Sequence, residues 1–193
     1  MLYRRIIALT LSVTLAIASL GGVEARWQDE TRAKVAEAVN LLRTDRLLAV
    51  SRLRALGALA VPFLVEVLKS MDQPVVPVRL ILLNFIAETK GGESDAALIE
   101  LSSDSEPYIR GFAAVAPGER KVGAAIPNLV ALLNDKEIYM SHVTTDPYRE
   151  EHRLVRDAAI AALRSITGQN VARGKSQEEQ AKSWQRWWRK QQK

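Results

Sequence analysis

The sequence predicts an all-α protein in which about four helical hairpins stack side by side as a superhelix, an α-solenoid. First, Ala and Leu carry most of the 48% hydrophobic content, aromatic residues make up only 6%, and the apolar positions recur at helical spacing. Second, the helical segments are short and fall into pairs with Gly or Pro at the turns. Third, the pairs resemble one another and return about every 32 residues, as in repeats that bury their apolar faces against neighbours.

The first hairpin occupies residues 45–71. A helix that starts at Arg46 carries apolar residues on one side and is expected to end at Gly57. Val61 and Pro62 open the partner helix, because a proline in the first helical turn lacks an N–H that would have no partner there.

The second and third hairpins repeat this layout. The second has a helix from Arg79, a turn at Gly91-Gly92 and a further apolar helix. The third has a helix from Arg110 that Pro117-Gly118 is expected to break, since proline inside a helix removes a hydrogen bond. Ile126-Pro127 then opens its partner helix.

A fourth helix runs from Arg156 to Gly168, and an extra segment precedes it. Residues 137–154 break the repeat pattern, and we interpret them as an inserted loop. Inserted segments of repeat proteins often lie on the binding face, and aromatic residues and Met are enriched at interfaces. The candidate partner contacts in this loop are Tyr139, Met140, His142 and Tyr148.

An arginine leads each unit at an equivalent place. The four are Arg46, Arg79, Arg110 and Arg156. We expect them to cap backbone carbonyls or to pair with acidic residues such as Asp45 or Asp157, since surface ion pairs are common. A row that binds an anionic partner is the alternative.

Residues 1–25 have the three parts of a secretory signal peptide. Two arginines precede the uncharged apolar stretch Ile6–Leu20, a Gly-Gly pair follows, and Ala25 is the last residue before the expected cleavage site. The alternative is an uncleaved membrane anchor, although the stretch is shorter than the roughly 20 residues that a span prefers. The mature chain is expected in the periplasm or outside the cell, with membrane contact only if the N-terminus is uncleaved.

The repeats, residues 45–169, have a flanking segment on each side. Residues 26–44 predict an N-terminal cap helix, centred on Glu30–Leu42. Residues 170–193 predict a linker and a tail helix, whose start has Ser176 and Glu179 spaced as a capping box.

Three tryptophans share one face of the tail helix. Trp184, Trp187 and Trp188 stand at i, i+3 and i+4, so we expect them to dock this helix onto the last repeat. The alternative is an exposed aromatic anchor for a partner or a membrane surface, helped by the basic residues around it.

The sequence predicts no catalytic, cofactor-binding or metal-binding residues. The chain has no cysteine, no His-Glu-x-x-His, no Gly-x-Ser-x-Gly and no glycine-rich phosphate loop. His142 and His152 are the only histidines, and ten residues is not a recognised ligand spacing. The net charge of +5 is scattered rather than gathered in a stripe, which argues against nucleic-acid binding.

Three segments carry a resemblance to a known family. RLLAVSRLRALGALAVPFLVEVLKS, RGFAAVAPGERKVGAAIPNLVALLND and VRDAAIAALRSITGQ resemble the short bacterial HEAT repeats, including the lyase-type group known as PBS-lyase HEAT, a relative of the armadillo repeats. The ending SWQRWWRK is similar to tails of exported HEAT-repeat proteins. The chain departs from the family pattern where Pro117-Gly118-Glu119 replaces the usual Leu-Gly turn, and where residues 137–154 are inserted.

The resemblance implies protein–protein interaction rather than a reaction. We therefore expect a non-enzymatic, monomeric scaffold that binds an unknown protein partner. The resemblance also implies an alternative, a lyase-like HEAT protein acting on a tetrapyrrole-carrying protein. A second alternative is an envelope-associated structural factor held by an uncleaved N-terminus.

Overall fold

The computed structural model describes residues 24–70, 76–145, 148–171 and 175–193. Most of these residues are helical, which confirms the predicted class, and one antiparallel pair of strands is the exception. The chain divides into two compact units, Met1–Phe63 and Leu64–Lys193. The predicted signal peptide, apart from its last two residues, lies outside the described part.

The first unit contains two helices and a short turn. Residues 24–41 form one helix, which starts and ends a few residues before the predicted cap segment 26–44, and α2 follows as Arg46–Leu56. Asp45 caps α2, because its carboxylate accepts a hydrogen bond from the N–H of Leu48 at 3.0 Å. Gly57 ends α2 with a φ of 56°, so the predicted turn is present.

Within the described residues, one stretch is long and apolar enough to cross a membrane by length and composition alone, and that stretch is Arg46–Ser70. Its backbone changes direction at Gly57, where the short 3₁₀ helix Gly57–Ala60 separates α2 from α3, Val61–Ser70. The two α-helices have 11 and 10 residues, and each is therefore shorter than the roughly 20 residues of a membrane span.

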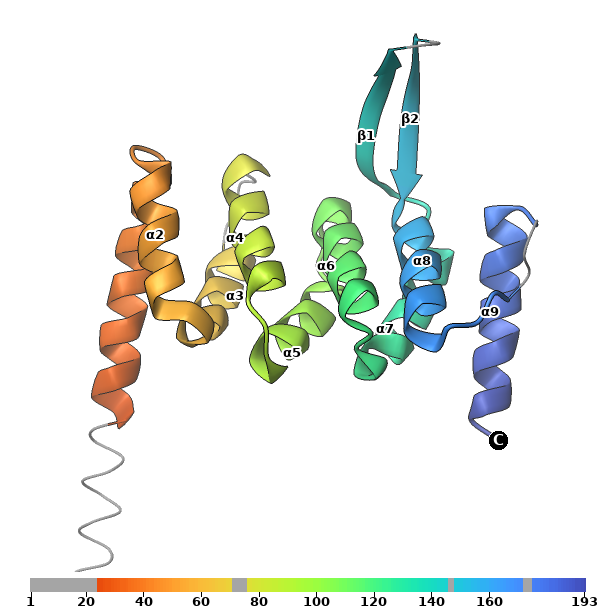
Figure 1. The fold of residues 1–193 in the computed structure, drawn as a ribbon, viewed down its shortest axis with the longest axis horizontal. Coiled ribbons are helices and arrows are strands. Elements are labelled where there is room, and N and C mark those ends of the chain that lie inside the picture. The colour runs from red at the N-terminus through yellow and green to blue at the C-terminus, as the bar shows by residue number, and fades with distance from the viewer. Residues whose placement is uncertain (1–23, 71–75, 146–147, 172–174) are drawn as a thin grey trace, which may run out of the picture. The chain divides into compact units, whose positions relative to one another are not determined.

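The second unit continues as further helices with the strand pair between them (Figure 1). Its elements after α3 are α4 Val76–Glu88, α5 Gly92–Leu101, α6 Pro107–Arg120, η2 Gly123–Ala125, α7 Ile126–Ala131, η3 Leu132–Asn134, β1 Ile138–Thr145, β2 Tyr148–Leu154, α8 Val155–Thr167 and α9 Gln177–Gln191.

Helices α6 and α8 pack closely against each other. A Cβ at Gly118 of α6 would lie 2.7 Å from the Cα of Ala162 on α8, so only glycine permits this approach. The prediction that Pro117-Gly118 breaks the third helix is wrong, because Pro117 lies inside α6 and the helix ends only at Lys121, with φ 58°. The packing of α6 against α8 outweighs the roughly 3 kcal/mol that an internal proline costs.

Two of the leading arginines, Arg79 and Arg110, lie on the first helix of a helical pair. Each contacts an aspartate that follows the second helix of the same pair. Arg79 lies 3.5 Å from the carboxylate of Asp104, which follows α5, and both side chains are buried. Arg110 donates from Nε to the carboxylate of Asp135, which follows η3, at 2.7 Å. Arg110 also donates to the backbone carbonyl of Asp104 at 2.8 Å, so it joins two successive pairs.

The other two leading arginines differ. Arg156 lies 3.8 Å from the carboxylate of Asp157, one of the two acidic partners expected from the sequence. Arg46 is exposed at the start of α2, and the other expected partner, Asp45, serves as the cap of that helix.

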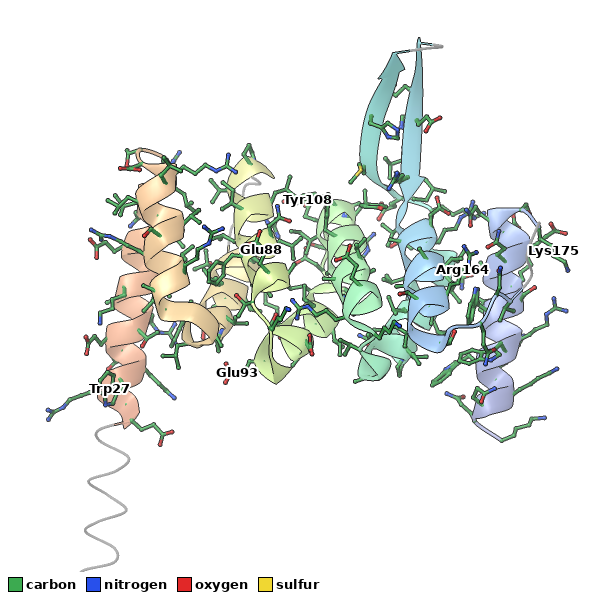
Figure 2. All side chains as sticks on the ribbon, viewed as in Figure 1. Trp27, Glu88, Glu93, Tyr108, Arg164 and Lys175 are labelled. Atoms are coloured by element: carbon green, nitrogen blue, oxygen red, sulfur yellow. The ribbon has the colours of Figure 1, made fainter. Side chains whose placement is uncertain are left out.

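The tail helix α9 is docked on α8 in the second unit. Its predicted capping box is present, with Ser176 accepting from the N–H of Glu179 at 3.3 Å. Arg164 of α8 donates to the side-chain oxygen of Gln180 at 2.9 Å, and Gln180 donates to the carbonyl of Lys175 at 2.8 Å. Figure 2 shows Arg164 on α8 and Lys175 at the start of α9.

Candidate interaction site

The segment that we expected to be a loop is an antiparallel β-ribbon. Strands β1 and β2 pair from Ile138 opposite Leu154 to Thr145 opposite Tyr148. Figure 1 shows the ribbon extending beyond the ends of α6 and α8. The loop prediction is therefore wrong, because β1 is rich in β-branched and aromatic residues that favour a strand.

The root of the ribbon is buried in the helical core. The pairing register shifts between Ile138 and Met140, so Tyr139 is an extra residue on β1, as in a β-bulge. Its side chain is only 8% exposed, and its ring packs edge-on against Phe112 of α6 with 5.6 Å between centroids. The backbone of Gly111 leaves the room for this ring, because a Cβ there would overlap the Cβ and Cγ of Tyr139.

Tyr139 is therefore no partner contact, and this correction to the sequence interpretation has a simple cause. Alternation along a strand says which residues share a face, but a bulge re-aims one side chain, and no feature of the sequence marked the bulge. Tyr139 belongs to the core cluster around α8, which includes Val155 and Leu163.

The two ends of the ribbon are held together at its base. The N–H of Val155 donates to the carbonyl of Glu137 at 2.9 Å, and the N–H of Arg156 donates to the carbonyl of Asp135 at 3.0 Å. Arg110 adds side-chain hydrogen bonds to Asp135 and Glu137. Burial lowers the pKa of the Arg110 guanidinium, but these two hydrogen bonds and charges outweigh burial and raise the pKa above its ordinary value.

The outer part of the ribbon carries polar cross-strand pairs. His142 Nε2 lies 3.3 Å from the carboxylate of Glu151, and both side chains are partly exposed. Ser141 Oγ lies 2.9 Å from His152 Nδ1, and His152 lies 3.9 Å from the carboxylate of Glu150. The pairs His142–Glu151 and Ser141–His152 join directly opposite residues and hold the two strands in register, whereas Glu150 and His152 lie on the same strand.

The two histidines point to opposite faces of the ribbon. His142 is paired with Glu151, whereas His152 is paired with Ser141, the residue next to His142 on β1. Because successive side chains of a strand alternate between faces, the two imidazoles cannot ligate one ion. The described residues contain no group of three or more potential ligands that could hold a metal ion.

The other predicted contact residues have different positions. His142 is exposed on the outer ribbon, and Met140 is half-buried against the core at the root. Tyr148 pairs with Thr145 through the backbone, and its side chain lies outside the described part. Among the three predicted residues whose side chains are described, Tyr139 is buried, Met140 is half-buried and His142 is exposed.

Sequence reasoning missed several exposed polar residues of the ribbon. These are Ser141, Glu150 and Arg153, and His152 was considered only as a metal ligand. The signal that could have found them is the run of β-branched residues, Val143 to Thr145, followed by Asp146-Pro147 and then Tyr148. Two strand-like runs around turn residues predict a hairpin, whose outward residues alternate.

The tryptophans of α9 differ in how deeply they are buried. Trp184 is fully buried in the core cluster around α8. Trp187 is half-buried and packs edge-on against Trp184 with 5.2 Å between centroids, and Trp188 lies 6.2 Å from Trp187. Among these three tryptophans, Trp184 is therefore fully buried, whereas Trp187 and Trp188 are half-buried.

The ribbon combines a rigid root with an exposed polar outer part. This arrangement is suited to contact with another molecule, since a two-stranded ribbon leaves backbone donors and acceptors along its edges. A scan against models of known protein families finds no match to this chain, and a search of curated proteins finds no relative.

Proposed function

We propose that this chain is an exported, non-enzymatic HEAT-type repeat scaffold that binds a protein partner through the outer part of its β-ribbon. The outer part is defined by the exposed side chains Ser141, His142, Glu150 and His152. The observation that carries the proposal is a set of exposed polar side chains on a ribbon whose root is buried.

The repeat architecture is supported by the recurrence of one contact. In two successive helical pairs, an arginine on the first helix meets an aspartate that follows the second helix: Arg79 with Asp104, and Arg110 with Asp135. Repeated contacts at equivalent positions are expected where similar units stack, because each unit presents the same chemistry to its neighbour. Arg110 also donates to the backbone carbonyl of Asp104, in the segment that connects the two helical pairs.

Binding through the ribbon is supported by the contrast between its fixed base and the exposed side chains Ser141, His142, Glu150 and His152. A two-stranded hairpin is marginally stable in water on its own. Here Tyr139 and the backbone bonds at Glu137 and Asp135 hold the base in place. The outer residues are thus presented without the full entropy loss that a flexible loop undergoes on binding.

Export is supported by the N-terminal sequence alone. Arg4 and Arg5, the apolar stretch Ile6–Leu20 and Ala25 match the order of a cleavable secretory signal. Mass spectrometry of the protein recovered from the periplasm tests this point. A mass beginning at or near Arg26 supports export with cleavage, whereas retention of residues 1–25 supports the anchored alternative.

A shortened ribbon tests the binding proposal. Residues 142–151 are replaced by Asn-Gly, which closes a tight hairpin between the opposite residues Ser141 and His152 and keeps Tyr139 at the root. The tagged full chain and the shortened variant are cross-linked in cells, and the captured proteins are compared.

We expect one or more proteins to be captured by the full chain and lost from the shortened variant, while the melting temperatures of the two remain close. A matched control replaces Lys69 and Lys121, which are exposed and lie outside the ribbon, with Gln. Equal capture by the full chain and the shortened variant would remove the ribbon from the binding surface.

A further inference from the structure

A cavity lies between the linker and the tail helix in the second unit. Its volume is about 370 Å³, within the range of roughly 300–1,000 Å³ that small-molecule sites occupy. Two lining residues come from the linker, Val171 and Lys175, and four come from α9: Ser183, Arg186, Trp187 and Lys190. Figure 2 shows Lys175 beside the first turn of α9.

Four lining residues form one face of α9. Positions 183, 186, 187 and 190 are three and four residues apart, so their side chains stand one above another. Ser183 is 8% exposed, and its hydroxyl donates to the carbonyl of Glu179 at 2.8 Å. Arg186 donates to the same hydroxyl at 3.1 Å, which holds the guanidinium beside the cavity.

The ionisable groups that line this cavity are cationic. Lys175, Arg186 and Lys190 contribute three positive charges, and no carboxylate lines the cavity within the described part of the chain. Glu178 and Glu179 are the acidic residues nearest in the chain to Lys175, and neither lines the cavity. Hydrogen bonds from the N–H and hydroxyl of Ser176, with a smaller attraction from Lys175, lower the pKa of the Glu179 carboxyl.

The stability of the helix explains only part of this charge. Cations near the last turn of a helix interact favourably with its dipole, which accounts for Lys190. The dipole does not account for Lys175, which precedes α9 and lies at the opposite end of that helix. Lys175, Arg186 and Lys190 nevertheless line the same cavity, and their charges make it attractive to an anion.

The wall beside these charges is apolar. The half-buried ring of Trp187 is fixed by its edge-on contact with Trp184, and Val171 adds aliphatic surface. A fixed indole can stack on a flat ring or cover an acyl chain. Three cations match a phosphate group better than they match a carboxylate. A phosphate group carries nearly two negative charges and three acceptor oxygens, whereas a carboxylate carries one negative charge.

From these residues we propose that the cavity binds the phosphate group of a phosphorylated compound, with an apolar or aromatic portion of that compound against Trp187. Arg186 holds the phosphate, and Lys175 and Lys190, near opposite ends of α9, add their positive charges to its attraction. The same chemistry is offered by a soluble organic phosphate and by the headgroup of an anionic phospholipid, and the experiment separates these two sources.

Two probes test the soluble source by calorimetry on the full chain: phenyl phosphate and inorganic phosphate. We expect phenyl phosphate to bind more tightly than inorganic phosphate, because only the former has a ring to place on Trp187. In the variant K175Q/K190Q the binding should weaken about tenfold or more, because two of the three positive charges at the cavity are removed.

Vesicles test the headgroup source. The full chain and its variants are sedimented with phosphatidylcholine vesicles that do or do not contain phosphatidic acid. The apolar N-terminal residues are present in every variant and contribute equally, so the comparison isolates the cavity. Greater binding of the unmodified chain than of K175Q/K190Q to vesicles with phosphatidic acid assigns the site to a lipid headgroup.

The control variant K69Q/K121Q removes the same charge from exposed positions outside the cavity. It should bind every probe as the unmodified chain does. The proposal is overturned if K175Q/K190Q and K69Q/K121Q behave alike with both phosphate probes and with the vesicles. It is also overturned if phenyl phosphate and inorganic phosphate bind equally and no vesicle binding depends on the cavity lysines. Thermal melting of each variant checks that these exposed substitutions leave the fold intact.

Discussion

The root and the outer part of the β-ribbon lie only a few residues apart and are held by different forces. At the root, the ring of Tyr139 is packed against Phe112 and the backbone of Gly111. In the outer part, His142 and Glu151 form a polar pair that water reaches. The comparison teaches that burial of one aromatic side chain fixes the ribbon, while the exposed cross-strand pairs refine its register.

The largest effect is expected for Tyr139→Ala. Replacement of a large buried aromatic side chain by Ala typically costs about 3–5 kcal/mol, and Tyr139 also loses its contact with Phe112. Urea denaturation of the full chain measures this loss. The control His142→Ala should change the free energy of unfolding by less than about 0.5 kcal/mol, as exposed substitutions do. Similar effects of both variants would show that the root is not the anchor.

A smaller loss, about 1–3 kcal/mol, is expected for Gly111→Ala, because the added methyl group overlaps Tyr139 and forces the ring or α6 to move. Gly92→Ala is the matched control. A Cβ at position 92 meets nothing within 4 Å, and Ala is the better helix former. The two melting temperatures should therefore move in opposite directions. If Gly111→Ala also raises the melting temperature, Tyr139 is not packed against the backbone of residue 111 as closely as the structure shows.

Substitution at the base of the ribbon, where Arg110 binds Asp135, is expected to destabilise the protein less than substitution of Tyr139 at the root. Asp135→Asn weakens the hydrogen bond from Arg110, and we expect a loss of about 1–2 kcal/mol because the pair is largely buried. The exposed pair Lys34–Glu30 supplies the control, since Glu30→Gln should cost less than about 0.5 kcal/mol. Thermal unfolding of both variants gives the comparison. Equal losses of stability in the two variants would mean that burial of the Arg110–Asp135 pair does not strengthen its contribution to stability.

The smallest effect is expected in the outer part. A double-mutant cycle with His142→Gln and Glu151→Gln should give a coupling energy of about 0.2–1 kcal/mol, as partly exposed cross-strand pairs do. A coupling energy above about 2 kcal/mol would contradict the expected difference in strength between the contacts of the root and those of the outer part. It would mean that the outer ribbon is held by its polar pairs as firmly as the root is held by packing.

Much of the helical framework was predictable from local residue chemistry. Ser176 caps a helix at the expected position, and Gly57 and Gly168 end helices with positive φ, whereas Asp45, expected as an ion-pair partner, caps α2. Each of these features depends on one residue and its nearest neighbours in the chain. Local rules were therefore sufficient for the bounds of α2, α8 and α9.

Features that depend on distant residues were not predictable in this way. Pro117 was expected to end a helix, but the contact between Gly118 and Ala162 keeps it inside α6. Tyr139 was expected at the surface, but a bulge turns it into a space left by Gly111. In both cases the deciding partner lies more than 20 residues away, where no periodicity in a single sequence identifies it.

The candidate site was predicted in location but not in form. Residues 137–154 were singled out as a possible binding segment, yet their strand character and the exposed pairs of Glu150 and His152 were missed. The cavity beside Trp187 was not expected either, because it needs Val171 and Lys175 of the linker to lie against one face of α9.

The backbone bond between Val155 and Glu137 has an evolutionary consequence. Because the two ends of the ribbon meet there, the chain leaves and re-enters the helical framework at nearly one point. A hairpin attached in this way can lengthen, shorten or exchange its tip during descent without displacing the helices on either side. Position 137 and position 155 are accordingly a natural junction at which foreign hairpins can be grafted onto this protein.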